Sequence, residues 1–249
     1  MRELQNCEGP ISGEHLISES VIKVLRGEGD FTVSGLPWQE ADEEKRLAPA
    51  NLTANCLCRR HNSALTPLDS AAGLFFSSLR DCMEMEDAPT PFLFSGHDIE
   101  RWLLKTLKAM AVSGNLARGR VRLPGVFARD VDVIKLLDHS DKWPSAAGLY
   151  FIMPTGARFI NHPRFRLQPW FDDAQEEIVG LWASFYGLEF VMMIAAPNVT
   201  ASPGLKQWLY RPGSIEMSIG KSRRLIELSW QDGMPHAPVK FVFEQSVNR

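Results

Sequence analysis

Apolar residues recur along the chain with two different spacings, which predict helices in the middle of the chain and strands in its second half. Between residues 66 and 140 they recur every three or four positions, the spacing of one helix face. We expect the first helix to begin at Thr66 and Pro67 and the second to be capped by Ser95. After residue 146, short apolar or alternating runs separated by Gly, Pro and Asn predict a mainly antiparallel sheet, with one helix over 172–187.

The first 65 residues show neither spacing over a long stretch and contain three of the four cysteines. Gly and Pro interrupt Gly27–Arg46, which indicates a loop or a small hairpin inserted into this region. We therefore predict an α+β protein in two parts. Residues 1–80 would form a small module that ends in a helical segment, and residues 81–249 would form an α+β domain.

The composition is that of an ordinary soluble protein, with 45% hydrophobic residues, 23% charged residues and a formal net charge of −3. No apolar run reaches the roughly 18 residues that a membrane-spanning helix needs, and the N-terminus has no apolar stretch of signal-peptide type. We expect a cytoplasmic protein without membrane contact, in which thiols stay reduced. Clustered Cys and His residues then indicate a metal site rather than a disulfide.

Positive charge is concentrated in residues 101–129, which contain no Asp or Glu. Two interpretations are equally open: a basic face that contacts nucleic-acid phosphates, or a solvated helix face followed by a basic loop. The basic residues of this block are Arg101, Lys105, Lys108, Arg118, Arg120, Arg122 and Arg129.

Two short stretches carry the residues with the clearest chemistry. The first, "CEGPISGEHLISESV", contains Cys7, Glu14 and His15. The second, "NLTANCLCRRHNSALTPLD", begins at residue 51 and ends at residue 69. Together they give the order Cys, Glu-His, Asn-Leu, Cys-x-Cys-x-x-His-Asn. In this order the sequence resembles the HNH, or ββα-metal, endonuclease family, in its cysteine-containing form. "SGEHLISES" is similar to the family's S-x-E-H-I-I-P-x-S segment, and "CRRHNSALTPLD" to its C-x-x-C-N-x-x-x-x-x-x-L-D segment. The resemblance covers roughly residues 5 to 75.

The resemblance implies a ββα-metal module that hydrolyses phosphodiester bonds with Mg²⁺ or Mn²⁺. In such a module His15 would act as general base, oriented by Asn51 or alternatively by Asn55. Glu14 and Asn62 would bind the catalytic ion through oxygen atoms. DNA is the expected substrate, although nothing in the residues excludes RNA.

The resemblance also implies a structural Zn²⁺ ion held by cysteine and histidine. Candidate zinc ligands are Cys7, Cys56, Cys58 and His61. The sequence departs from the family pattern because Pro10 stands where a second cysteine would follow Cys7. Cys56 is therefore either the fourth ligand or a small buried side chain. Candidate contacts to nucleic-acid phosphates are Arg59, Arg60, Lys105 and Lys108.

The function expected from the sequence is thus a metal-dependent HNH-type endonuclease, of the kind that serves in bacterial defence. Its C-terminal domain would select the target, bind a protein partner or form a homo-oligomer. The alternative is a non-catalytic, zinc-stabilised module that binds nucleic acid or protein; it would need Cys7, Cys58 and His61 but neither Glu14 nor His15. No motif supports a third alternative, an enzyme whose site lies in the C-terminal domain.

Overall fold

The computed structural model describes most of the chain. The described residues are 5–26, 31–34, 39–40, 43–115, 117–118, 121–122, 132–138, 142–153, 156, 158–159, 164–172, 177–197 and 207–244.

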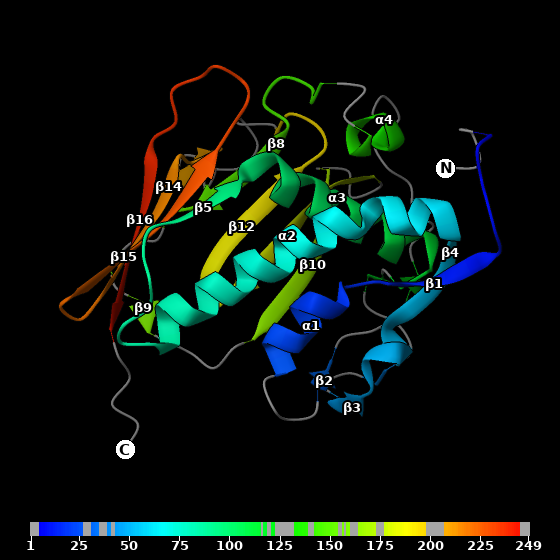
Figure 1. Cartoon of the computed structure of the whole chain (residues 1–249), viewed down its shortest axis with the longest axis horizontal. Coiled ribbons are helices and arrows are strands. Elements are labelled where there is room, and N and C mark those ends of the chain that lie inside the picture. Colours follow the sequence, from blue (N-terminus) through cyan, green and yellow to red (C-terminus); the bar gives the residue numbers. More distant parts are fainter. Residues whose placement is uncertain are drawn as a thin grey trace.

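The N-terminal part is built on an antiparallel pair of strands that leads directly into a long helix (Figure 1). Strand β1 (Ile11–His15) pairs with β4 (Thr53–Cys58), and α2 (Arg59–Glu84) begins at the next residue. The elements between β1 and β4 are α1 (Glu19–Arg26), β2 (Phe31–Val33), β3 (Lys45–Leu47) and the 3-10 helix η2 (Pro49–Leu52). Strands β2 and β3 pair antiparallel, which favours the small hairpin over the loop, the two alternatives expected for this segment.

The β1–β4 pairing contains one bulge. Ser12 lies opposite Leu57 and Gly13 lies opposite Asn55, so that Cys56 is an extra residue in β4. A bulge changes the direction in which the neighbouring side chains point. The two cysteines of the Cys-x-Cys sequence therefore do not follow the simple alternation of a regular strand.

Helix α2 begins seven residues before the predicted start at Thr66. Cys58 occupies its N-cap position with an extended backbone, and Pro67 lies inside the helix. An internal proline removes one backbone hydrogen bond, to the carbonyl of the residue four positions earlier. Here that residue is Ser63, and both Ser63 and Pro67 are exposed, so water can satisfy the carbonyl. The helix continues through Pro67 because the missing hydrogen bond lies on the side of the helix that faces solvent.

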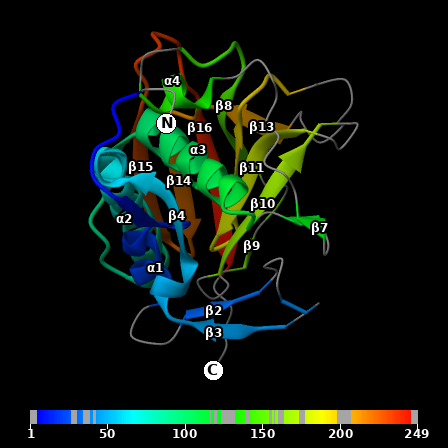
Figure 2. The ribbon, with the colours of Figure 1, turned by 90° about the vertical axis from the view of Figure 1, so that its right-hand side faces the viewer.

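Helix α3 (Gly96–Val112) runs between α2 and a sheet, as Figure 2 shows. Its predicted cap is confirmed, since Ser95 Oγ accepts a hydrogen bond from the Asp98 backbone N–H at 3.3 Å. Neighbours on two sides bury most of the helix, including Trp102 and Leu104, neither of which is exposed. Short elements that follow it are β6 (Ala117–Arg118), β7 (Val121–Arg122) and α4 (Val133–Leu137).

Two five-stranded sheets form the rest of the described chain. The first is antiparallel throughout, as predicted, in the order β10 (Phe165–Phe171), β11 (Ile178–Phe185), β12 (Leu188–Met193), β8 (Gly148–Ile152) and β13 (Trp208–Tyr210). The second has the order β5 (Phe92–Ser95), β15 (Ser222–Ser229), β14 (Ser214–Ile219), β16 (Pro238–Glu244) and β9 (Arg158–Phe159). Only its β14–β15 pair is antiparallel, so the second sheet is mixed. The α+β class is confirmed.

The helix expected over 172–187 is wrong, because strand β11 occupies residues 178–185; residues 173–176 lie outside the described residues. Its side chains alternate with the period of a strand: Leu181, Ala183 and Phe185 are fully buried, whereas Trp182 and Ser184 are only partly buried. Pairing with β10 on one side and β12 on the other supplies the backbone hydrogen bonds. Tertiary pairing therefore outweighs the helix-like composition of the segment.

One hydrophobic core joins the N-terminal elements to both sheets among the described residues. At its centre the ring of Phe76 on α2 packs at 5.2–5.3 Å against the rings of Trp102, Phe165 and Phe185. The division expected after residue 80 falls inside α2. None of the described helices is long and apolar enough to cross a membrane.

Candidate functional site

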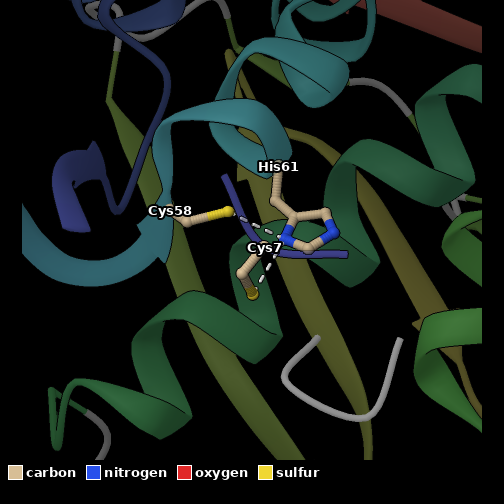
Figure 3. A group of neighbouring side chains, drawn as sticks. All are labelled: Cys7, Cys58 and His61. Atoms are coloured by element: carbon tan, nitrogen blue, oxygen red, sulfur yellow. Dashed lines mark hydrogen bonds between the residues drawn. The ribbon is translucent and has the colours of Figure 1, made fainter. Parts of the chain in front are cut away.

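Two cysteines and a histidine gather where β4 passes into α2. Cys7 precedes β1, Cys58 is the last residue of β4, and His61 lies in the first turn of α2. His61 Nδ1 is 3.1 Å from Cys58 Sγ and 3.7 Å from Cys7 Sγ. Figure 3 shows both sulfur atoms beside the same ring nitrogen. The three donor atoms lie within 4.8 Å of one another, so that a single metal ion could bind all of them.

The hydrogen bonding of His61 suits a metal ligand. Its Nε2 lies 2.9 Å from Oδ1 of Asn6, an oxygen that can only accept. The proton therefore belongs on Nε2, which leaves a lone pair on Nδ1 facing the two sulfur atoms. Tetrahedral zinc with ordinary bond lengths separates a nitrogen ligand from a sulfur ligand by about 3.6 Å. The two N–S distances lie on either side of this value, so the spacing of the three donor atoms is compatible with a single bound metal ion.

The surroundings of Cys58 favour its thiolate, the form that binds metal. The backbone N–H group of His61, at the start of α2, lowers the pKa of Cys58 below its ordinary value of 9.0. Burial opposes this shift, whereas the backbone N–H groups of Glu8 and Arg60 support it. The start of a helix presents several such N–H groups, which is why a cysteine at the N-cap is well placed to be an anionic ligand.

Cys56, the expected fourth zinc ligand, is not part of this group. Burial raises the pKa of the Cys56 thiol, and the charge of Glu14 raises it further. Cys56 is the extra residue of the bulge and lies in the electrostatic field of Glu14 and Lys105. The described structure thus brings together three of the four expected ligands.

The residues expected to hold a catalytic ion lie around the end of β1. Asn62, in the first turn of α2, donates from Nδ2 to Ser12 Oγ at 3.0 Å and to the Gly13 carbonyl at 3.3 Å. These bonds fasten the start of α2 to β1 beside the Glu14–His15 pair. His15, the last residue of β1, is partly buried, and its backbone pairs with Thr53.

The two asparagines that were alternatives for orienting His15 are both exposed. Asn51 lies in η2, and no described hydrogen bond joins its side chain to His15; its backbone N–H donates to the Ala48 carbonyl at 2.9 Å. Asn55 lies opposite Gly13 in the β1–β4 pair. The choice between them stays a prediction.

Glu14 is buried and is held by a lysine from another helix. Its side chain and that of Lys105 on α3 are 4% and 3% exposed, and the Lys105 ammonium forms an ion pair with Glu14 Oε1. The same ammonium lies 2.5 Å from Asp69 Oδ1 on α2. Burial raises the pKa of Glu14, although the positive charge of Lys105 partly offsets this effect. Lys105 therefore does not lie on the surface where we expected it to contact phosphates.

Asp69 is fixed by further hydrogen bonds, from the segment that enters α1. Ser18 Oγ donates to Asp69 Oδ1, and Trp102 Nε1 donates to Ser18 Oγ at 2.6 Å. Ser20 Oγ donates to the backbone carbonyl of Asp69 at 2.7 Å. We call Glu14, Lys105 and Asp69 the buried charge cluster. The motif stretches contain Glu14 and Asp69, but nothing in the sequence indicated that the two meet at Lys105, which lies on α3 outside both stretches.

A pocket of about 670 Å³ lies beside both groups. Its polar lining includes the three metal-site residues, Cys7, Cys58 and His61, as well as Glu14, Lys105 and Lys108. Most of the remaining wall is apolar and comes from β1, β4, α3 and α4. The candidate phosphate contacts Arg59 and Arg60 are exposed at the start of α2, and Arg60 forms an ion pair with Glu8.

Comparison of the chain with known protein families, with curated proteins and with solved structures gave no match. The site is therefore interpreted from its own geometry and chemistry.

Proposed function

We propose that the protein is a metal-dependent phosphodiesterase of the HNH type that cuts DNA. The observation that carries this proposal is the contact between Asn62 and the end of β1. Asn62 lies more than forty residues after Glu14 and His15, yet its amide reaches the carbonyl of Gly13 at 3.3 Å. This contact brings the helix start that carries Asn62 to the strand end that carries Glu14 and His15, which supports a site made of a base and two oxygen ligands.

Each residue has a role in this proposal. His15 is partly exposed, so water can reach its imidazole, which would take a proton from that water as general base. Asn62 uses its Nδ2 to hold β1, which leaves its amide oxygen as a metal ligand together with a Glu14 carboxylate oxygen. Mg²⁺ or Mn²⁺, when bound, neutralises the charge that builds up on the scissile phosphate.

The second metal in the proposal is a structural zinc ion on Cys7, Cys58 and His61. It would tie the segment before β1 to the junction of β4 and α2, and so fix the start of the helix that carries Asn62. Three protein donors leave one position of a tetrahedral ion for water or another donor.

The state of Glu14 favours a second candidate function, a zinc-stabilised binding protein without catalysis. The Lys105 ammonium already compensates the Glu14 carboxylate, so that Glu14 can stay ionised without a divalent ion. Such a protein would still bind zinc through Cys7, Cys58 and His61, and His15 would have no catalytic role.

Plasmid cleavage with Mg²⁺ or Mn²⁺ separates the two candidates, with EDTA as the control for metal dependence. We expect the wild type to nick or linearise the plasmid and His15→Ala to lose this activity while its circular dichroism stays unchanged. Asn62→Ala should also be inactive, and Asn51→Ala and Asn55→Ala identify the residue that orients the base. Equal cutting by wild type and His15→Ala would remove this site from the reaction. A wild type that cuts with neither ion would support the binding protein.

Zinc content tests the metal group independently of cleavage. Cys58→Ala and Cys56→Ala are matched variants, two residues apart in the same strand. We expect zinc, measured by atomic emission on purified protein, to be lost from Cys58→Ala and retained at one equivalent in Cys56→Ala. Equal loss in the two variants would contradict the three-residue group.

A further inference from the structure

Lys105 places a positive charge between two carboxylates that come from different elements. We infer that its ammonium occupies the position of a divalent cation, so that Glu14 and Asp69 form a cation site which Lys105 keeps closed. This inference rests on the proposed function and adds two things to it: a further ligand, Asp69, and a form of restraint. Neither Asp69 nor Lys105 belongs to the ligand pair taken from the family resemblance, which is Glu14 and Asn62.

The geometry of the cluster is that of a cation with two oxygen ligands. Lys105 Nζ is in contact with Glu14 Oε1 and lies 2.5 Å from Asp69 Oδ1. Divalent ions of the Mg²⁺, Mn²⁺ or Ca²⁺ type bind carboxylate oxygens at about 2.0–2.6 Å. A divalent ion that replaced the ammonium between the two carboxylates would therefore have one oxygen from each of them as a ligand.

The charges within the cluster also favour a divalent ion. Two carboxylates face one ammonium, and the side chains of Glu14 and Asp69 are only 4% and 23% exposed. Apart from its ion pair with Lys105, Glu14 Oε1 is buried without a hydrogen-bond partner among the described residues. Buried carboxylates are costly unless their charge is matched. A lysine matches one of the two charges, whereas a divalent ion matches both.

The location of Lys105 allows the site to open. Both carboxylates belong to the N-terminal elements, whereas Lys105 belongs to α3, which packs behind them. Lys105 also lines the pocket of about 670 Å³, which gives its flexible side chain space to turn away from the carboxylates. A phosphodiester that enters this pocket would attract the ammonium and so free the two carboxylates for the ion that its hydrolysis needs.

Mn²⁺ binding to the zinc-loaded full-length protein, followed by electron paramagnetic resonance, tests the inference without reference to cleavage. Lys105→Met keeps the length of the side chain and removes its charge, and Lys23→Met, at an exposed lysine on α1 outside the pocket, is the control for the loss of one positive charge. We expect Lys105→Met to bind one Mn²⁺ ion at least tenfold more tightly than the wild type. Lys23→Met should bind like the wild type, and adding Asp69→Asn to Lys105→Met should abolish the gain. No gain in Lys105→Met, or a gain that persists without Asp69, would overturn the inference.

Thermal unfolding covers the case in which Lys105→Met folds poorly. Two unmatched carboxylates should lower its melting temperature, and Mn²⁺ should restore it in this variant alone. If Mn²⁺ leaves the melting temperature of Lys105→Met unchanged, Lys105 is only a structural counter-ion and the inference fails.

Failure of the two proposals can be told apart. Lys105→Met that binds Mn²⁺ but cuts no plasmid would support the cation site and count against the nuclease. A wild type that cuts plasmid, with a Lys105→Met variant that gains no Mn²⁺, would support the nuclease and overturn the cation site.

Discussion

Replacement of Glu100 by glutamine would test how strongly a buried charge fixes the start of α3, the helix that carries Lys105. Glu100 has no exposed surface. Its Oε1 accepts hydrogen bonds from the Leu149 backbone N–H at 2.7 Å and from Arg211 Nε at 2.8 Å. Its Oε2 accepts from the second terminal nitrogen of Arg211 at 3.1 Å and lies 3.2 Å from His97 Nδ1. One carboxylate thus links α3 to β8 and to the segment between β13 and β14.

The loss of unfolding free energy expected for Glu100→Gln depends on which hydrogen bonds remain after the substitution. Breaking a buried ion pair by removing one charge costs about 3–5 kcal/mol, because the other charge stays buried. In Glu100→Gln the amide can still accept from Leu149, and Arg211 keeps its hydrogen bond to Asp232 at 2.8 Å. We therefore expect a loss near the lower end of the range, about 3 kcal/mol of unfolding free energy.

Urea unfolding followed by tryptophan fluorescence measures this loss, and a matched control lies on β14. Glu216 pairs with Lys240 at 3.5 Å, but the two side chains are 43% and 67% exposed. Because exposed pairs contribute little, Glu216→Gln should lose less than about 1 kcal/mol. If the two variants lost the same free energy, burial would not determine the strength of the Glu100 network and the reasoning would be refuted.

Two further predictions concern the core and the response to acid. Phe76→Ala should lose about 3–5 kcal/mol of unfolding free energy in the same urea assay, because Phe76 is fully buried. Leu74→Ala should lose less than about 0.5 kcal/mol, because the Leu74 side chain is exposed. Similar losses in the two variants would contradict the central place of Phe76 in the core. Burial tends to raise the pKa of Asp232, but hydrogen bonds, first from Arg211, lower it to about 2 from 3.8. Asp232 therefore contributes about 1–2 kcal/mol to the free energy of unfolding, after allowance for its partial exposure. This stabilisation is present above about pH 4 and is lost as the pH falls through about 2. The stability difference between the wild type and Asp232→Asn should shrink over this interval, and a constant difference would contradict the prediction.

Local signals in the sequence predicted the elements that depend on local contacts. Ser95 caps α3 because a serine three residues before Asp98 can accept that residue's N–H, whatever the rest of the chain does. Cys58 and His61 lie three residues apart at the start of a helix, and this spacing alone brings their side chains together. The addition of Cys7 to them came from the family resemblance, since nothing local joins residues 7 and 61.

The wrong expectations concern contacts between distant residues. A basic residue on an amphipathic helix normally faces water, but Lys105 faces carboxylates supplied by β1 and α2. The acidic stretch before Ile178 resembles a helix start, whereas pairing with two neighbouring strands makes the following residues a strand. Thr66 and Pro67 form a good helix start in isolation, but α2 has already begun at Arg59. In each case the deciding partner is remote in the sequence.

The aromatic packing of α2 has a consequence for synthesis on the ribosome. Phe76 finds part of its packing in Phe185 and Phe190, more than a hundred residues further along the chain. At a translation rate of about 5–20 residues per second, these partners emerge roughly 5–20 seconds after the helix. During that interval the apolar face of α2 is uncovered in the nascent chain. A ribosome-bound chain that is stalled after α2 has left the ribosome, but before Phe185 is synthesised, should therefore bind a chaperone that recognises apolar segments, and the completed chain should release it.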